Sequence, residues 1–534
     1  MLAVGASAAG VSPALASPAA DPSAVQDDTP EGRAVREAAE SGKPVEVLSK
    51  RDETTQVLAN PDGTFTWRQY VRPAFAKVDG DWKEADATMR KRADGRVGPA
   101  AATFGLSFSG GGDAPLATME KAGKSLSITW PKALPEPLLS GDTATYPDVL
   151  PGVDLRIQAD VDGFAQHLVV KTREAAAQPG LAELTYGLRS QGTVLKADGA
   201  GKLKVTDSEG NELFTAPTPV MWDSSHESHE VAENTATGRA TQAGFRGKRS
   251  AVAAAAAGPT TTGAQDGPPS KVVEMPTKVV DNTLRISPDA DFLKAPDTVF
   301  PVTIDPIFSG GGRNAWTIAY NKGGSLTGTS FWNGGGFSDK LARIGHENWT
   351  NGTARSYFRM DTDGLGGARI ISATFNLLNS YSWSCAPTPV EFGWTGPISE
   401  STTWNNQPSW NETLETKSFA HGWTGDGSQC KGGEGQDFSN AALKRLVQRA
   451  ADRGDANLTF GLRSRSDYEN KVSSWKKFHN NPHLEVTYNR APKVNSFAAF
   501  QGPWSPGGED NLKVACDDDP ATWPTIGRND LTLT

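Results

Sequence analysis

Residues 401–410 read STTWNNQPSW. In this stretch Trp404 and Trp410 stand six residues apart, on either side of a run of amide side chains and Pro408. One interpretation is a sugar-binding ledge, because the C–H face of a sugar ring can stack on an electron-rich indole and because amides both donate and accept hydrogen bonds. The other interpretation is a rigid loop that buries its own tryptophans.

The flanking region, residues 307–490, holds nine of the fifteen tryptophans and has the period-two pattern of short β-strands. Ser356, Phe358 and Met360 are predicted to share one face of a strand. The same alternation occurs in three further runs, which are Ile371, Ala373, Phe375 and Leu377, then Leu458, Phe460 and Leu462, then Leu484, Val486 and Tyr488. These runs predict a β-sandwich.

One helix is expected within this region, at residues 440–453. An apolar stripe from Leu443 to Ala450 recurs at helical spacing, and basic side chains occupy the opposite face. Ser439 is the predicted N-cap, with Phe438 and Leu443 as a hydrophobic staple. Gly454 can end the helix in the left-handed conformation.

The remaining regions differ in composition. Residues 45–305 alternate like strands and predict a β-rich N-terminal domain, interrupted by a polar, flexible insertion at 223–270. Residues 1–22 are small and apolar, which is typical of a signal peptide or, alternatively, of a disordered Ala/Pro tail. Residues 491–534 begin a new module and stop in mid-strand, which indicates an incomplete immunoglobulin-like domain of a longer protein, or a disordered tail.

Composition and charge limit the fold class and the kinds of partner that the chain can have. With 56 Gly and 35 Pro in 534 residues, the chain favours many turns and a mostly β fold. A net charge of −9 argues against a general nucleic-acid partner, whose binding rests on clustered Lys and Arg. Beyond the leader, no stretch reaches the roughly 18 apolar residues that a membrane span needs. The signal-peptide-like leader predicts a secreted or extracellular location.

The chain has three cysteines, which is an odd number for a secreted protein. Cys385 and Cys430 both lie in the Trp-rich region, so we expect a disulfide between them. Cys516 is left over, and its partner would lie beyond Thr534.

Catalytic motifs do not occur in the sequence. There is no G-x-S-x-G elbow, no H-E-x-x-H, no P-loop and no Cys-x-x-Cys, so no enzyme is predicted, although a pair of carboxylates for glycoside hydrolysis stays open. No cofactor is expected. Asp361 and Asp363, or Asp305, could hold Ca²⁺ through their oxygens, but turn-stabilising carboxylates are the favoured interpretation.

The stretch Gly-Pro-Ile-Ser-Glu-Ser-Thr-Thr-Trp-Asn-Asn-Gln-Pro, at 396–408, resembles the W-x-E-S-x-x-T-W-N-N-Q-P run of the DNRLRE domain family, also classed as a carbohydrate-binding module. Pieces at 341–345, 355–361, 370–375, 438–447 and 482–488 follow that family's order, although the run that spells the family name is absent. The resemblance implies a jelly-roll-like, non-catalytic β-sandwich that binds polysaccharide in some members.

The candidate carbohydrate-binding side chains are those of Trp383, Trp394 and Trp410. The run Trp404, Asn405, Asn406, Gln407 and Pro408 is interpreted as a structural motif, with Trp404 favoured for the core.

Residues 45–305 and 491–534 are also similar to the front ends of large secreted actinobacterial proteins, some of which are toxins. The predicted function is therefore a secreted, non-catalytic, multidomain protein that binds extracellular or cell-wall polysaccharide. The alternative is a structural scaffold or delivery portion of a larger secreted YD-repeat toxin or adhesin.

Overall fold

The computed structural model describes residues 29–199, 201–224, 272–305, 307–310, 315–324, 326–335, 337, 339–348, 350–423, 430 and 432–490. It also pairs the short strands β36 (Ala499–Phe500) and β37 (Lys513–Val514). The predicted leader, nearly all of the predicted insertion 223–270, most of the predicted immunoglobulin-like segment and Cys516 lie outside the described residues.

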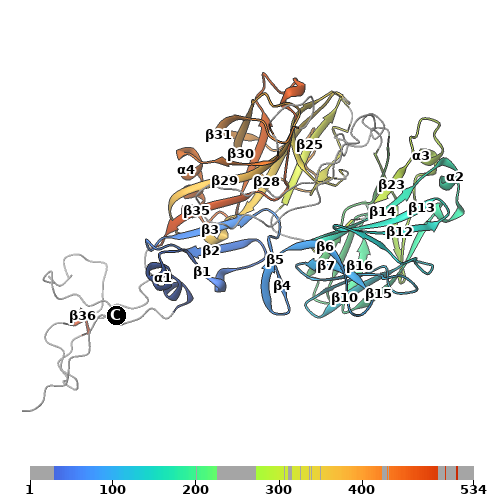
Figure 1. Cartoon of the computed structure of the whole chain (residues 1–534), viewed down its shortest axis with the longest axis horizontal. Coiled ribbons are helices and arrows are strands. Elements are labelled where there is room, and N and C mark those ends of the chain that lie inside the picture. The colour runs from blue at the N-terminus through green and yellow to red at the C-terminus, as the bar shows by residue number, and fades with distance from the viewer. Residues whose placement is uncertain are drawn as a thin grey trace, which may run out of the picture.

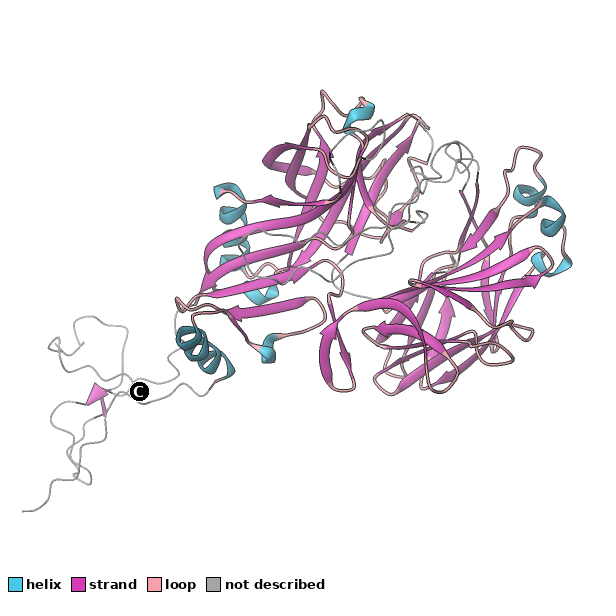
Figure 2. Ribbon diagram, in the orientation of Figure 1, coloured by secondary structure: helices cyan, strands magenta, loops and turns pink. Residues whose placement is uncertain are grey.

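The described chain is mostly β, as predicted, and its strands form antiparallel sheets with few helices (Figure 2). They build two bodies with separate cores. We call residues 29–71 and 315–490 the sandwich, and residues 86–310 the inserted body. A two-stranded hairpin, β4 (Phe75–Val78) and β5 (Asp81–Glu84), lies between them in sequence.

The sandwich consists of two sheets that share one strand. The first sheet runs in the order β1 (Val45–Glu46), β2 (Thr55–Ala59), β3 (Phe65–Tyr70), β35 (His483–Asn489), β29 (Arg369–Ser382), β34 (Lys476–Phe478) and β27 (Ala342–Glu347), with β32 (Glu434–Phe438) beside β29. From β27 the second sheet continues through β28 (Gly352–Asp361), β33 (Asn457–Ser464), β30 (Thr388–Thr395) and β31 (Trp410–Phe419), with β25 (Ala315–Lys322) on β28 and β26 (Phe331–Trp332) on β25.

The inward faces of these strands form a core rich in aromatic rings. Phe375 of β29 and Phe460 of β33 both pack against Phe392 of β30, with ring centres 4.8 and 5.2 Å away. The predicted faces of β28, β33 and β35 are confirmed, since every one of their predicted inward side chains is buried. Ile371 differs: a β-bulge between Ile370 and Ser372 turns Ile370 inward and leaves Ile371 exposed.

Helix α4 (Ala441–Arg453) confirms the predicted helix, and Gly454 ends it with φ of 68°. Its N-cap is Asn440 rather than Ser439. The Asn440 Oδ1 accepts hydrogen bonds from the amides of Ala442 and Leu443, while the Ser439 hydroxyl donates to the Ala373 carbonyl. The longer Asn side chain thus satisfies the first free amides of the helix.

The first three strands, β1 to β3, belong to the sandwich. The sequence pattern instead predicts a separate N-terminal domain from residue 45 onward. Strand β3 pairs with β35 over six residues, from Phe65 opposite Tyr488 to Tyr70 opposite His483. Figure 1 shows the blue strands β2 and β3 beside the orange β35. Helix α1 (Pro30–Ser41) packs on β1 and β2. Trp67 and Val57 are buried in the sandwich core, because an alternating strand contributes its apolar face to whichever sheet it joins.

The inserted body also has two packed sheets. One runs in the order β21 (Thr277–Val280), β22 (Thr283–Ile286), β15 (Leu184–Gln191), β10 (Lys124–Thr129), β9 (Ala117–Lys121), β8 (Gly105–Phe108), β7 (Val97–Ala101) and β6 (Asp86–Lys91). The other runs in the order β11 (Leu138–Ser140), β12 (Thr143–Leu150), β13 (Val153–Asp160), β14 (Gly163–Val170), β24 (Ile307–Ser309), β18 (Glu212–Ala216), β17 (Leu203–Thr206) and β16 (Val194–Ala197).

Three further strands and two short helices complete this body. Strand β23 (Val302–Asp305) pairs with β14 and with β19 (Val220–Asp223), which pairs with β20 (Val272–Glu274). The helices are α2 (Arg173–Ala176) and α3 (Ala290–Lys294). Phe108 and Phe164 meet across the two sheets with ring centres 5.2 Å apart. In the described part of the chain, no helix has both the length and the apolar character that crossing a bilayer requires.

Candidate functional site

The loop that carries STTWNNQPSW lies over the outer face of the second sheet of the sandwich. Ile398 of this loop joins Ala319 of β25 and Tyr357 of β28 in a small buried cluster. Trp404 and Trp332 pack against that cluster and are half-buried. The loop therefore covers a sheet face with its own apolar side chains, and Trp404 serves as a packing residue.

Gln407 connects the loop to the sheet. Its Oε1 accepts hydrogen bonds from the Tyr357 hydroxyl at 2.8 Å and from Arg355 Nη1 at 3.2 Å. Its Nε2 donates to the Trp404 carbonyl at 2.9 Å. The side chain thus fixes the turn before Pro408 and satisfies a hydroxyl on the sheet.

Arg355 supports the same loop from below. Its guanidinium carbon lies 4.9 Å from the Trp404 ring centre, and its Nε and Nη2 donate to the two Glu469 carboxylate oxygens at 2.6 and 2.8 Å. Paired guanidinium–carboxylate bonds hold the arginine in one orientation under the indole.

Asn405 ties the loop to a neighbouring loop. Its amide N donates to the Thr327 carbonyl at 2.9 Å, and its Nδ2 donates to the Thr327 hydroxyl at 3.1 Å. Asn406 and Asn405 are both exposed. Most polar groups of the run are therefore used inside the fold, which supports its interpretation as a structural motif.

Trp410 is half-buried, and its ring lies close to glycine backbone. A Cβ placed on Gly393 or Gly461 would come within 2.3 and 2.7 Å of the Trp410 ring, so only glycine permits the indole to lie there. Arg463 stacks on the ring, with its guanidinium carbon 3.9 Å from the ring centre. The indole N–H donates to the Thr413 hydroxyl. The ring thus contacts both the glycine backbone and the Arg463 guanidinium.

Trp394 packs against the edge of the sandwich core, and the Arg449 guanidinium carbon of α4 lies 5.3 Å from its ring centre. Beside it, Glu412, Ala442, Arg445, Gln448 and Arg449 line an open hollow of about 310 Å³. Of the three tryptophans predicted to bind carbohydrate, Trp394 and Trp410 therefore each carry an arginine over the ring.

Trp383 lies in a different place, at the end of the sandwich that the disulfide closes. Its ring centre is 5.7 Å from that of Trp423, and the Trp423 ring is 6.1 Å from that of Tyr381. All three side chains are half-buried. We call Tyr381, Trp383 and Trp423 the aromatic cluster. Of these three residues, the sequence predicts only Trp383 as a binding candidate, although Trp423 stands only seven residues before Cys430.

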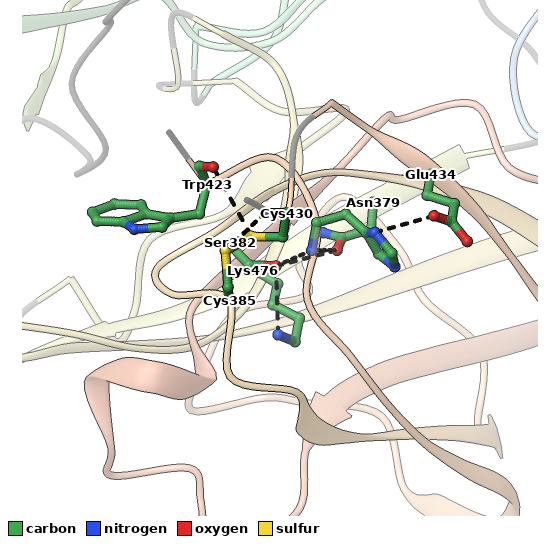
Figure 3. The surroundings of a disulfide bond; sticks show 8 residues. Asn379, Ser382, Cys385, Trp423, Cys430, Glu434 and Lys476 are labelled. Atoms are coloured by element: carbon green, nitrogen blue, oxygen red, sulfur yellow. Dashed lines mark hydrogen bonds and ion pairs between the residues drawn. A yellow bond between two sulfur atoms is a disulfide. The ribbon is translucent and has the colours of Figure 1, made fainter. Parts of the chain in front are cut away.

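The predicted disulfide between Cys385 and Cys430 is confirmed, with Cα atoms 5.4 Å apart. Figure 3 shows it between Trp423 on one side and Asn379 and Glu434 on the other. The Cys430 amide donates to Cys385 Sγ, and the Gly422 amide donates to the Cys430 carbonyl. The bond thus fixes the segment that carries Trp423.

A buried polar network lies behind the disulfide. The His421 amide donates to Asn379 Oδ1 and Ser382 Oγ, both at 3.1 Å. Lys476 is fully buried, and its Nζ donates to the same Ser382 hydroxyl at 3.5 Å. Burial lowers the pKa of Lys476 to about 7. The core of this region therefore contains an amine that loses its charge near neutral pH.

The carboxylates considered for calcium have other contacts. Asp361 accepts a hydrogen bond from the Asp363 amide at 2.9 Å, as a turn carboxylate does, and both line a hollow that also includes Arg359. Asp305 is buried on β23, 3.5 Å from His167 Nε2. Among the described residues, no group of three or more His, Cys, Asp or Glu side chains gathers in a metal-binding arrangement.

Comparison with known proteins gives distant relatives. No protein-family model matches the chain. The chain is 22% identical over 475 residues to the tRNA(Glu)-specific nuclease WapA of Bacillus subtilis subsp. natto, which is 84% of this chain and 18% of that protein. It has the same identity and coverage with the tRNA nuclease WapA of Bacillus subtilis.

A third relative is the tRNA3(Ser)-specific nuclease WapA of Bacillus spizizenii, which is 22% identical over 499 residues, 88% of this chain and 19% of the relative. The chain is thus similar, over most of its length, to a portion of three much longer proteins that are named tRNA nucleases, and it spans less than a fifth of the length of each.

Proposed function

We propose that this chain is a non-catalytic structural portion of a larger, secreted, toxin-like protein. The observation that carries the proposal is the coverage of the similarity, which extends over 84% of this chain but 18% of the relative. A segment of that share is large enough to be a supporting unit, and the rest of such a protein has ample length for a nuclease.

The structure supports this proposal through the use of its polar and aromatic side chains. In the STTWNNQPSW run, the side-chain amides of Asn405 and Gln407 form hydrogen bonds to Thr327, Tyr357 and Trp404. Two large cores account for most of the buried apolar residues. The net charge of −9 also argues against tRNA as a partner of this portion, because phosphate binding depends on clustered cations.

A nuclease assay tests the non-catalytic part of the proposal. Purified chain is incubated with total tRNA, with and without divalent cations, and the products are separated on a sequencing gel. We expect intact tRNA at every time point. Cleavage that co-elutes with the chain and is lost on a single substitution within residues 29–490 would overturn the proposal.

A second candidate function is polysaccharide binding by the sandwich, in keeping with the resemblance to the DNRLRE domain family. The observation that favours it is the aromatic cluster, where three half-buried rings meet at one end of the sandwich. Adjacent indoles can stack on the C–H faces of neighbouring sugar units. The disulfide would hold this platform in place without a ligand.

Affinity electrophoresis of the full chain through gels that contain different polysaccharides tests this candidate. Trp383→Ala and Trp423→Ala are expected to abolish retardation, while Trp410→Ala, at a ring that Arg463 covers, is expected to keep it. No retardation by any polysaccharide, or equal retention by all three variants, would remove the aromatic cluster as a glycan site.

A further inference from the structure

The inserted body interrupts the sandwich. The chain leaves the sandwich after β3, builds the inserted body and then re-enters the sandwich at β25. Two segments therefore connect the bodies, an outgoing one after Tyr70 and a returning one before Ala315. Arg72 of the outgoing connection and Gly310, at the end of the inserted body, both contact the turn between β13 and β14, residues 160–163, which we call the 160–163 turn.

The outgoing connection is held at Arg72. Its backbone N–H donates to Asn481 Oδ1 of the sandwich at 2.7 Å. Its guanidinium contacts the Asp160 carboxylate and donates to Asp162 Oδ1 at 2.8 Å, both in the inserted body. Arg72 thus bonds to the sandwich through its main chain and to the inserted body through its guanidinium.

This ion cluster is shielded from solvent. The side chains of Arg72 and Asp160 are 16% and 19% exposed. Burial alone lowers the pKa of Arg72, but the charges of Asp160 and Asp162 outweigh it and hold the pKa above its ordinary value. Lys340 of the sandwich adds a second cation 3.7 Å from Asp160. Partly buried pairs with matched hydrogen bonds resist screening by salt.

The end of the inserted body is held by the backbone of the same turn, next to the pairing of β14 with β24. The Gly310 amide donates to the Asp162 carbonyl at 2.7 Å, and the Gly310 carbonyl accepts from Lys121 Nζ at 3.0 Å. Gly163 allows this close approach, because a Cβ there would lie 2.3 Å from the Phe308 carbonyl oxygen. Gly310, the last described residue before residues 311–314, therefore lies against the same turn as Arg72.

We propose that the 160–163 turn is a clamp that joins the inserted body and the sandwich into one unit of fixed orientation. The carboxylates of Asp160 and Asp162 hold Arg72, whose main chain is bonded to Asn481 of the sandwich. Asp160 also lies beside Lys340 of the sandwich, so the two bodies cannot swing apart without breaking these ion pairs. A contact between Lys202 of the inserted body and Glu400 of the sandwich loop provides a second point of attachment. The clamp does not depend on the proposed function.

Single-molecule fluorescence energy transfer tests the clamp on the full chain. Dyes are placed on cysteines at two exposed positions, Lys132→Cys in the inserted body and Lys444→Cys in the sandwich, with Cys516→Ser to avoid a third label. The parent is expected to give one narrow distribution of transfer efficiency. Asp160→Asn with Asp162→Asn is expected to broaden it, because Arg72 then loses both carboxylates.

The matched control is Asp113→Asn with Asp148→Asn, which removes the same charge from exposed positions of the same body and should leave the distribution narrow. A broad distribution in the parent would overturn the clamp whatever the variants do. So would an unchanged distribution in Asp160→Asn with Asp162→Asn. Far-ultraviolet circular dichroism of each variant is used to check that both bodies remain folded.

Discussion

Arg463 lies over Trp410, with its guanidinium carbon 3.9 Å from the centre of the indole ring. The arginine is itself held by Glu391, whose Oε2 accepts from Arg463 Nε at 2.7 Å. An indole that rests against glycine and carries a guanidinium contributes to packing, since cation–π contacts of this kind are favourable by roughly 0.5–1 kcal/mol. This arrangement gives the Trp410 ring a role in packing, while its role in sugar binding stays a prediction.

Gly461→Ala should destabilise the sandwich. The added Cβ would meet Trp410 Cζ3 at 2.7 Å and Thr395 Cγ2 at 2.8 Å, and overpacking of this kind costs roughly 1–3 kcal/mol. Urea unfolding followed by tryptophan fluorescence measures the loss. The control is Gly435→Ala on β32, where the nearest atom to a new Cβ is Asn376 Nδ2 at 3.7 Å. Equal effects in both variants would show that Trp410 does not rest on Gly461.

Gln407→Ala should loosen the loop. It removes the acceptor for the Tyr357 hydroxyl and the donor to the Trp404 carbonyl, and unsatisfied groups of this kind cost roughly 1–3 kcal/mol each when buried. Asn406→Ala changes an exposed neighbour and should be close to neutral. Chemical denaturation of the two variants provides the comparison, and a larger loss in Asn406→Ala would contradict the structural assignment of the motif.

Lys476 should make stability depend on pH. Because burial lowers its folded pKa to about 7 and the unfolded pKa is about 10.4, the unfolded state binds more protons between these values. The free energy of unfolding should therefore fall as the pH is lowered from about 10 to about 7, by at most about 1.4 kcal/mol per unit, and should level off below that.

Lys476→Met removes this slope, and Lys444→Met, at an exposed position on α4, keeps it. Urea midpoints at several pH values between 7 and 10 measure both. An identical pH slope in the parent chain and in Lys476→Met would mean that the buried amine is not the titrating group.

The Cys385–Cys430 disulfide should contribute to stability. It closes a loop with a sequence separation of 45 residues, and the chain-entropy model assigns about 4 kcal/mol to a loop of that size. Thermal unfolding of Cys385→Ser with Cys430→Ser should occur at a lower temperature than that of the parent. Cys516→Ser should unfold like the parent, and a matching loss in that variant would point to a different pairing.

Much of the sandwich can be predicted from local patterns. The alternation at Phe358, Phe460 and Val486 identifies three strands, and the stripe from Leu443 to Ala450 identifies α4, because strand and helix periods are properties of neighbouring residues. Local pattern fails at Ile371, where a bulge shifts the register by one residue. A bulge depends on the partner strand, which the local sequence does not contain.

The membership of β3 in the sandwich also lies beyond local pattern. Phe65 pairs with Tyr488, more than four hundred residues away, and the sequence of neither strand identifies its partner. The candidate site shows the same limit. The disulfide follows from the position of two cysteines, whereas the stacking of Arg463 on Trp410 and of Arg449 on Trp394 depends on which strand or helix lies alongside.

The size and location of the native polypeptide test most directly the proposal that this chain is part of a larger secreted protein. An antiserum against residues 29–490 is used on cell, cell-wall and culture-fluid fractions of the source organism, and the reactive band is sized. We expect a polypeptide several times longer than 534 residues in the wall or culture-fluid fraction. A reactive band no longer than this chain, confined to the cytoplasm, would contradict it.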